Sequence, residues 1–97
     1  MPGIPKRAKR DKNERQIILD LRAIGAGVIQ ISIKGVCDLL VGHINNLGIP
    51  TNYLIEIKQP GEGLTEDESE FFRTWPGQKG IAHNTQEALA IIGVIAE

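Results

Sequence analysis

Charged residues stand inside two of the most apolar stretches of this 97-residue chain. The first stretch begins at Cys37 and contains Asp38, and the second runs from Tyr53 to Lys58 and contains Glu56. A charged group in a half-buried strand loses its hydration, which destabilises the fold unless an opposite charge or a metal ion compensates. Two carboxylates in neighbouring strands therefore indicate a functional site.

Length and composition limit the class of protein. A chain of 97 residues fits one domain, which we place at residues 11–97, and self-association would help so small a core. No apolar run approaches the roughly 20 residues that span a bilayer, and the basic N-terminus is not followed by an apolar signal core. We therefore expect a cytoplasmic protein without a membrane partner. The lone Cys37 excludes an intramolecular disulfide and a zinc knuckle.

Basic residues gather at the start of the chain. Residues 1–10 also contain prolines and glycine without an apolar period, so we expect a flexible basic arm there. Such an arm can bind DNA by neutralising phosphates, and a solvated leader that only aids solubility is the alternative. The expected DNA-binding residues are Lys6, Arg7, Lys9, Arg10, Lys12 and Arg15.

Hydrophobic periodicity predicts an α/β fold with the order α-β-β-β-α-β-α. The first helix covers residues 11–24, the second starts with a capping box of Thr65 and Glu68, and Thr85 caps the third. The first three strands should form an antiparallel meander. The predicted strands are residues 26–33, 36–44, 51–58 and 80–83.

Strand alternation predicts which side chains share a face. Asp38 shares a face with Leu40, and Glu56 and Lys58 share one with Leu54. The first strand should have one well-buried face, and its alternation sets a row of isoleucines on one side. That row consists of Ile29, Ile31 and Ile33.

Helical spacing sets Glu14 on the apolar face of the first helix, because it lies three residues before Ile17 and four before Ile18. Its carboxylate should therefore point toward the core. The alternative is that Glu14 only complements the helix dipole in the first turn. We expect the aromatic residues of the second helix to pack against the sheet, rather than to stack on bases; they are Phe71, Phe72 and Trp75.

Carboxylates and a lysine in this arrangement suit metal-assisted hydrolysis. Mg²⁺ binds carboxylate oxygens together with waters and substrate phosphates. We expect Asp38 and Glu56 as ligands, helped by the main-chain carbonyl of Ile57, with Glu14 nearby and Lys58 acting on the attacking water. The pKa of Lys58 could fall through burial or stay high through pairing with Glu56. A plain ion pair between Glu56 and Lys58 beside an exposed Asp38 is the alternative.

The two histidines are expected to be bystanders. His43 falls near the end of the strand that bears Asp38, and His83 precedes the third helix. A single histidine at a strand end is most often solvated or hydrogen-bonded. No further His, Asp or Cys stands at the spacing of zinc ligands, so we expect no zinc site.

The order of these motifs resembles the VRR-NUC family of the PD-(D/E)XK nuclease superfamily, including its stand-alone phage-type members. The resemblance extends over about residues 12–92 and rests on Cys-Asp-Leu-Leu-Val-Gly from Cys37, Leu-Ile-Glu-Ile-Lys-Gln-Pro-Gly from Leu54, Leu-Thr-Glu-Asp-Glu from Leu64, and Trp75. It implies a restriction-endonuclease-like core with a mixed sheet. Two positions depart from the family pattern: Cys37 replaces the usual Pro, and Glu68 stands where Gln is common.

The same resemblance implies roles for the site residues. Asp38 and Glu56 would bind Mg²⁺ or Mn²⁺, Lys58 would position the water, and Glu14 would complete the acidic cluster. Gln59 would contact a metal-bound water or a phosphate.

Single-domain members of the family imply a substrate and an assembly. They resemble archaeal Holliday junction resolvases, which implies a homodimer that cuts a four-way DNA junction. The third helix and the aromatic cluster of the second are the candidate interfaces. The alternatives are a nicking or flap-type nuclease, a non-catalytic DNA-binding accessory module, and an inhibitor or structural oligomer.

Overall fold

The structure is a computed structural model that describes residues 12–94. Within this range no helix is long and apolar enough to cross a membrane. The expected basic arm, with Lys6, Arg7, Lys9 and Arg10, lies outside the described residues. The elements, in chain order, are α1 (Lys12–Ala23), β1 (Gly27–Gln30), β2 (Leu39–Ile44), β3 (Pro50–Ile57), α2 (Glu66–Thr74), β4 (Lys79–Ala82) and α3 (Thr85–Ile91).

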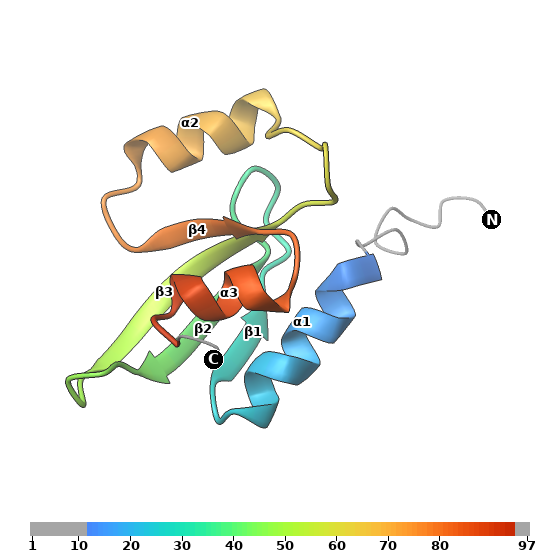
Figure 1. Cartoon of the computed structure of the whole chain (residues 1–97). Helices are drawn as coiled ribbons and strands as arrows, with labels where there is room; N and C mark the ends of the chain where they lie inside the picture. Colours follow the sequence, from blue (N-terminus) through green and yellow to red (C-terminus); the bar gives the residue numbers. More distant parts are fainter. Residues whose placement is uncertain (1–11, 95–97) are drawn as a thin grey trace.

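The four strands form one mixed sheet in the order β1-β2-β3-β4 (Figure 1). The pairs β1–β2 and β2–β3 are antiparallel, which confirms the predicted meander. Strand β4 pairs with β3 in parallel, so the chain crosses over through α2 between them. The fold is therefore α/β, with a four-stranded mixed sheet and three helices among the described residues.

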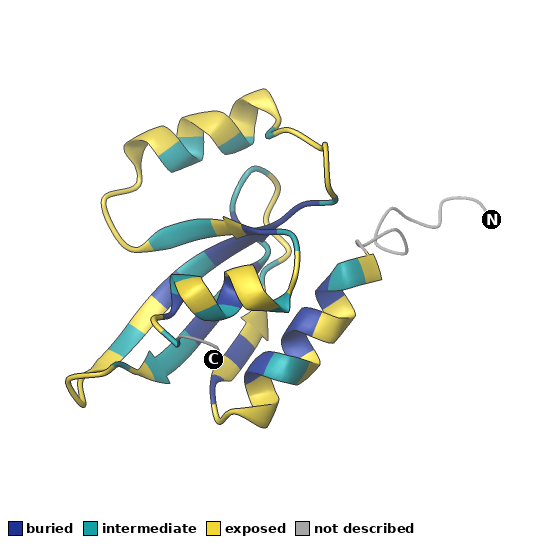
Figure 2. Ribbon diagram, viewed as in Figure 1, coloured by how far each residue is buried: buried dark blue, intermediate teal, exposed yellow. Residues whose placement is uncertain are grey.

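The core lies where α1 and α3 pack against the sheet and against each other. The buried positions of α1 follow its predicted apolar face, and the buried apolar residues of β3 alternate along the strand (Figure 2). The largest fully buried side chains are Ile17, Leu21, Cys37, Leu39, Val41, Ile55, Ile57 and Ile92. Cys37 therefore fills core volume at the position before Asp38.

Strand β1 is shorter than predicted, and its isoleucine row is not the buried side. Val28 is buried, whereas Ile29 is 62% exposed and Ile33, beyond the end of the strand, is 65% exposed. The reason is that α1 packs on the side of this edge strand that Val28 faces. Alternation alone could not choose between the two sides, because Val28 and Ile29 are both strand-forming apolar residues.

The N-terminal cap of α2 is the predicted one, whereas the N-terminal cap of α3 differs from the prediction. In α2, Glu68 N donates to Thr65 Oγ1 over 3.2 Å and Thr65 N donates to Glu68 Oε1 over 2.9 Å, which confirms the capping box. In α3 the cap is Asn84, one residue earlier than predicted, because its side chain accepts from the backbone of the first turn. Thr85 instead donates to Asp20 of α1 over 2.6 Å.

Helix α2 lies apart from the core, which corrects the expected packing of its aromatic residues. None of its residues is buried, and Trp75, which caps its C-terminal end, is 42% exposed (Figure 2). Phe71 stacks on Trp75 with ring centroids 5.4 Å apart. Both rings line an open cleft of about 650 Å³, which the apolar side chains of Leu40 and Leu54 also line. Phe71 and Trp75 thus border a cleft on the sheet instead of filling its core.

Candidate active site

Asp38, the residue just before β2, is fixed by hydrogen bonds of its backbone and of its side chain. Its N–H donates to Ile55 O over 3.1 Å, and its carbonyl accepts from Ile31 N over 2.7 Å. Its Oδ2 accepts a hydrogen bond from Ile57 N over 2.8 Å. The carboxylate therefore lies across the end of β3, beside the residue that separates Glu56 from Lys58.

Glu56 is a buried carboxyl group, 3% exposed, on the face of β3 opposite the core residue Ile55. Burial raises its pKa to about 9, and the charges of Asp38 and Glu68 act in the same direction, while Lys58 opposes them. Glu56 thus holds a proton at neutral pH when no cation is bound. A site that forces a proton onto a carboxylate is one in which a divalent cation can replace that proton.

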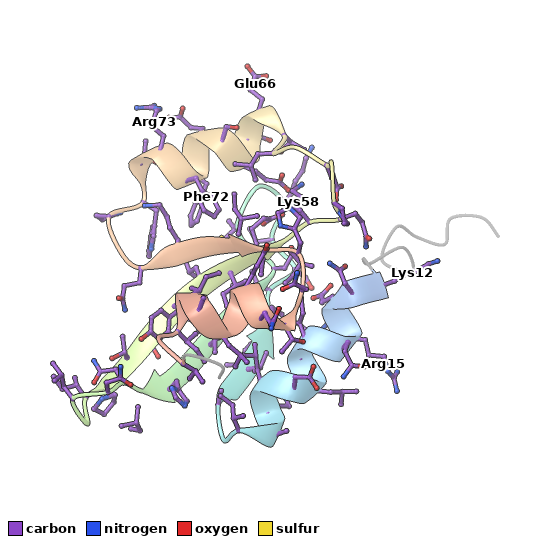
Figure 3. The ribbon with its side chains drawn as sticks, viewed as in Figure 1. Lys12, Arg15, Lys58, Glu66, Phe72 and Arg73 are labelled. Atoms are coloured by element: carbon purple, nitrogen blue, oxygen red, sulfur yellow. The ribbon has the colours of Figure 1, made fainter. Side chains whose placement is uncertain are left out.

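Lys58 is buried among three carboxylates from three segments of the chain. Its Nζ lies 2.8 Å from Glu68 Oε1, 3.7 Å from Glu56 Oε2 and 4.0 Å from Glu62 Oε2. Burial acts to lower the pKa of Lys58, but the hydrogen bond and charge of Glu68 and the charges of the other two carboxylates together outweigh it, and the pKa is raised. Of the two outcomes that the sequence left open, the lysine therefore stays charged. Figure 3 shows it projecting toward the side of the sheet on which α2 lies.

Glu68 is a site residue that the sequence did not assign. Burial acts to raise its pKa, but hydrogen bonds from Lys58 and from Thr65 N hold the pKa below its ordinary value. A hydrogen bond also links its carboxylate to the protonated Glu56. The available signal was its place in the capping box, which set its orientation relative to α2 but not relative to β3.

Glu14 is buried on the inner face of α1, as predicted. Its Oε2 accepts a hydrogen bond from Gln30 Nε2 over 3.3 Å. Its part in the acidic cluster stays a prediction.

Gln59 joins a hydrogen-bond network that ties α1 to the ends of two strands. Its side-chain amide donates to Asn13 Oδ1 over 2.8 Å. Asn13 Nδ2 in turn donates to Lys58 O over 3.1 Å and to His83 O over 2.7 Å. Asn13 is thus a second supporting residue that sequence patterns missed, since an amide in a first helical turn carries no specific signal.

The side chains of the two histidines lie outside this hydrogen-bond network. His83 Nδ1 lies 2.7 Å from Glu87 Oε1, and the same oxygen accepts from His83 N over 2.8 Å, which confirms a hydrogen-bonded bystander. His43 is half-buried, and its Nδ1 has no hydrogen-bond partner among the described residues. The expectation of a solvated or hydrogen-bonded side chain therefore does not hold for this nitrogen.

Two of the expected DNA-binding residues are described, and both are exposed on α1. Lys12 and Arg15 project outward from the helix (Figure 3). Together with Arg22 they line a cavity of about 690 Å³ that Glu14 and Gln30 also border. This side of α1 therefore carries the positive charge that phosphate contacts require.

The chemistry of the site fits a hard divalent cation in part. Asp38 and Glu56 supply carboxylate oxygens, and the Ile57 carbonyl belongs to the residue between Glu56 and Lys58. Among residues 12–94, no three His, Cys, Asp or Glu side chains are arranged to hold a metal ion together. Waters and substrate phosphates would therefore complete the coordination, as is usual for Mg²⁺.

Comparison of the chain with known proteins finds no similar protein. No protein-family model matches the chain, and no curated protein or solved structure is significantly similar to it.

Proposed function

We propose that this protein is a Mg²⁺-dependent endonuclease that hydrolyses phosphodiester bonds in structured DNA. The observation that carries the proposal is the meeting of Asp38, Glu56 and Lys58 where β2 begins and β3 ends, with the Asp38 carboxylate 2.8 Å from the Ile57 amide. The motif order and the α-β-β-β-α-β-α succession support membership of the VRR-NUC family and a restriction-endonuclease-like core.

Each residue has a defined task in this reaction. A bound Mg²⁺ or Mn²⁺ supplies a Lewis acid and lowers the pKa of a coordinated water. Asp38 and Glu56 would hold the cation, and the proton of Glu56 would pass to solvent when the cation binds. Lys58 is charged, so it orients the attacking water and faces the negative charge that develops on the phosphate oxygens.

The surroundings support a DNA substrate and a homodimer. The exposed Lys12 and Arg15 can contact phosphates on one side of the site. Apolar side chains of α3 pack on the core, so the aromatic cluster of α2 is the candidate interface that stays open. A two-fold dimer would match the symmetry of a four-way junction and would cover this cleft. We therefore propose the four-way junction as substrate.

Cleavage of labelled DNA tests the proposal. A four-way junction, a flap and a linear duplex are each incubated with the protein in Mg²⁺, in Mn²⁺ and in EDTA. We expect metal-dependent cleavage of the junction that is lost in Lys58→Ala and Asp38→Asn. Lys34→Ala is the matched control, because Lys34 is an exposed lysine in a turn. Cleavage by Lys58→Ala at the wild-type rate would refute the mechanism.

A non-catalytic DNA-binding module is the second candidate function. The observation that favours it is the absence, within residues 12–94, of three side chains arranged around a common metal position. This alternative predicts salt-sensitive DNA binding that survives EDTA, with no cleavage at any Mg²⁺ or Mn²⁺ concentration. Calorimetric titration with Mn²⁺ separates the two functions, because only the nuclease requires metal binding that Asp38→Asn removes.

A further inference from the structure

We propose that Glu68, on α2, is the positioning residue of the cleavage site and holds the ammonium group of Lys58 in its working place. The inference rests on the proposed nuclease function. It assigns a second task to a residue whose sequence pattern indicates only a helix cap. It also places part of the site on an element outside the sheet.

The contact between Glu68 and Lys58 is specific. Of the three carboxylates around Lys58 Nζ, only Glu68 is within hydrogen-bond distance, at 2.8 Å, whereas Glu56 and Glu62 lie at 3.7 Å and 4.0 Å. Lysine has a long flexible stem, and its ammonium group has three donors that do not fix a direction by themselves. One short charged hydrogen bond sets that direction and leaves other donors for a water or a phosphate.

Glu68 is itself held rigidly enough to do this. The oxygen that accepts from Lys58 also accepts from Thr65 N over 2.9 Å, and Glu68 N donates to Thr65 Oγ1 over 3.2 Å. These bonds close the first turn of α2, where the helix dipole also favours a carboxylate. The side chain is therefore oriented before substrate arrives.

Apart from its half-buried phenylalanines, α2 is attached to the rest of the protein near its two ends. None of its residues is buried. The side chain of Asp67 lies against Gly35, where an added Cβ would meet Asp67 Cβ at 3.1 Å. Just after the helix, Lys79 Nζ donates a hydrogen bond to Trp75 O over 2.6 Å. The Glu68–Lys58 bond is thus the described contact that joins the helix to the catalytic lysine.

Four variants separate positioning from helix capping. Glu68→Ala removes the acceptor of Lys58, and Glu68→Gln keeps a neutral acceptor. Thr65→Ala removes the capping hydroxyl but leaves the backbone N–H that holds Glu68, so it weakens the cap alone. Glu66→Ala removes an exposed acidic residue from the same turn, whose side chain points away from the site (Figure 3).

Single-turnover cleavage is the first measurement. Loss of a hydrogen bond to a charged group should slow Glu68→Ala by about tenfold to a hundredfold at saturating DNA, with little change in KM. Glu68→Gln should fall between Glu68→Ala and wild type, and Thr65→Ala and Glu66→Ala should stay close to wild type. Equal rates for Glu68→Ala and Thr65→Ala would overturn the inference.

Acylation of Lys58, followed by mass spectrometry on the folded protein, is a readout that needs no cleavage. Glu68→Ala should raise the labelling of Lys58 severalfold, and Thr65→Ala should leave it unchanged. Unchanged labelling in Glu68→Ala would overturn the inference even if the enzyme cuts DNA. If the wild-type protein cuts no DNA, the proposed function fails, whereas labelling still decides whether Glu68 holds the lysine. Should Glu68→Ala fail to fold, Glu68→Gln against Thr65→Ala gives the same comparison.

Discussion

Replacing Glu56 by Gln should change how the stability of the protein depends on pH. Burial and the charges of Asp38 and Glu68 raise the pKa of Glu56 from 4.5 to about 9. Because the folded-state pKa lies above the unfolded one, the stabilising contribution is complete below the unfolded pKa and is lost as pH rises toward the folded pKa. Each pH unit in that window costs about 1.4 kcal/mol, so the wild type should lose on the order of 3 kcal/mol relative to Glu56→Gln between about pH 6 and pH 8.

Urea unfolding in EDTA at a series of pH values measures this difference. The free energy of unfolding of Glu56→Gln should exceed that of wild type at pH 8, and the two should converge toward the unfolded pKa. Glu66→Gln is the control, because it removes an exposed carboxyl group from α2. Saturating Mg²⁺ should flatten the wild-type curve, since a nearby cation favours the charged carboxylate. Parallel curves for wild type and Glu56→Gln in EDTA would show that Glu56 ionises normally and would refute the reasoning.

Three further predictions concern other parts of the molecule. Cys37 is 1% exposed, and burial together with nearby carboxylates raises the pKa of its thiol to about 12. Iodoacetamide should therefore label this thiol only after unfolding, and labelling of the native protein would contradict the prediction. Gly80→Ala should lower the free energy of unfolding by about 1–3 kcal/mol, because the new Cβ meets an isoleucine side chain of α3 at 2.6 Å, whereas Gly27→Ala, with nothing within 4 Å, should not. Changing Lys12 and Arg15 together to Gln should reduce the slope of log affinity for DNA against log salt by about 2, as measured by fluorescence anisotropy; an unchanged slope would remove these residues from the interface.

The parts of the fold that follow from local rules could be predicted from the sequence. Alternation in β3 predicts that Glu56 lies on the face opposite to Ile55 and Ile57, and the structure, in which both isoleucines belong to the core, agrees. The meander follows from short turns between successive strands, and β2 pairs with β3 in the register that brings Leu39 opposite Ile55. Asp38 precedes that pair by one residue. Two-residue periodicity and antiparallel pairing were therefore enough to bring Asp38 near Glu56.

The parts that depend on packing between distant elements could not be predicted in this way. The choice of the buried side of β1 depends on where α1 lies, and Val28 and Ile29 are equally apolar candidates. The contact of Glu68 with Lys58 depends on the path of the chain between β3 and α2, which no periodicity encodes. The aromatic residues of α2 indicated a core-facing helix by spacing, yet Trp75 is 42% exposed, because spacing fixes which residues share a face but not what that face meets.

The sheet side of the candidate site, with Asp38 and Glu56, and the α2 side, with Glu68, are held by different kinds of interaction. Asp38 and Lys58 belong to backbone segments that are bonded to neighbouring strands, with Asp38 N donating to Ile55 O and Lys58 N donating to Ala82 O. The carboxylates of Asp38 and Glu56 should therefore keep their places unless the sheet itself opens. The ammonium group of Lys58 is different, because its short contact comes from Glu68 on a helix without a buried residue. A displacement of α2 would therefore release the lysine while Asp38 and Glu56 stay in place. If the proposed function holds, metal binding by the carboxylates and orientation of the water by Lys58 should respond separately to changes in this helix.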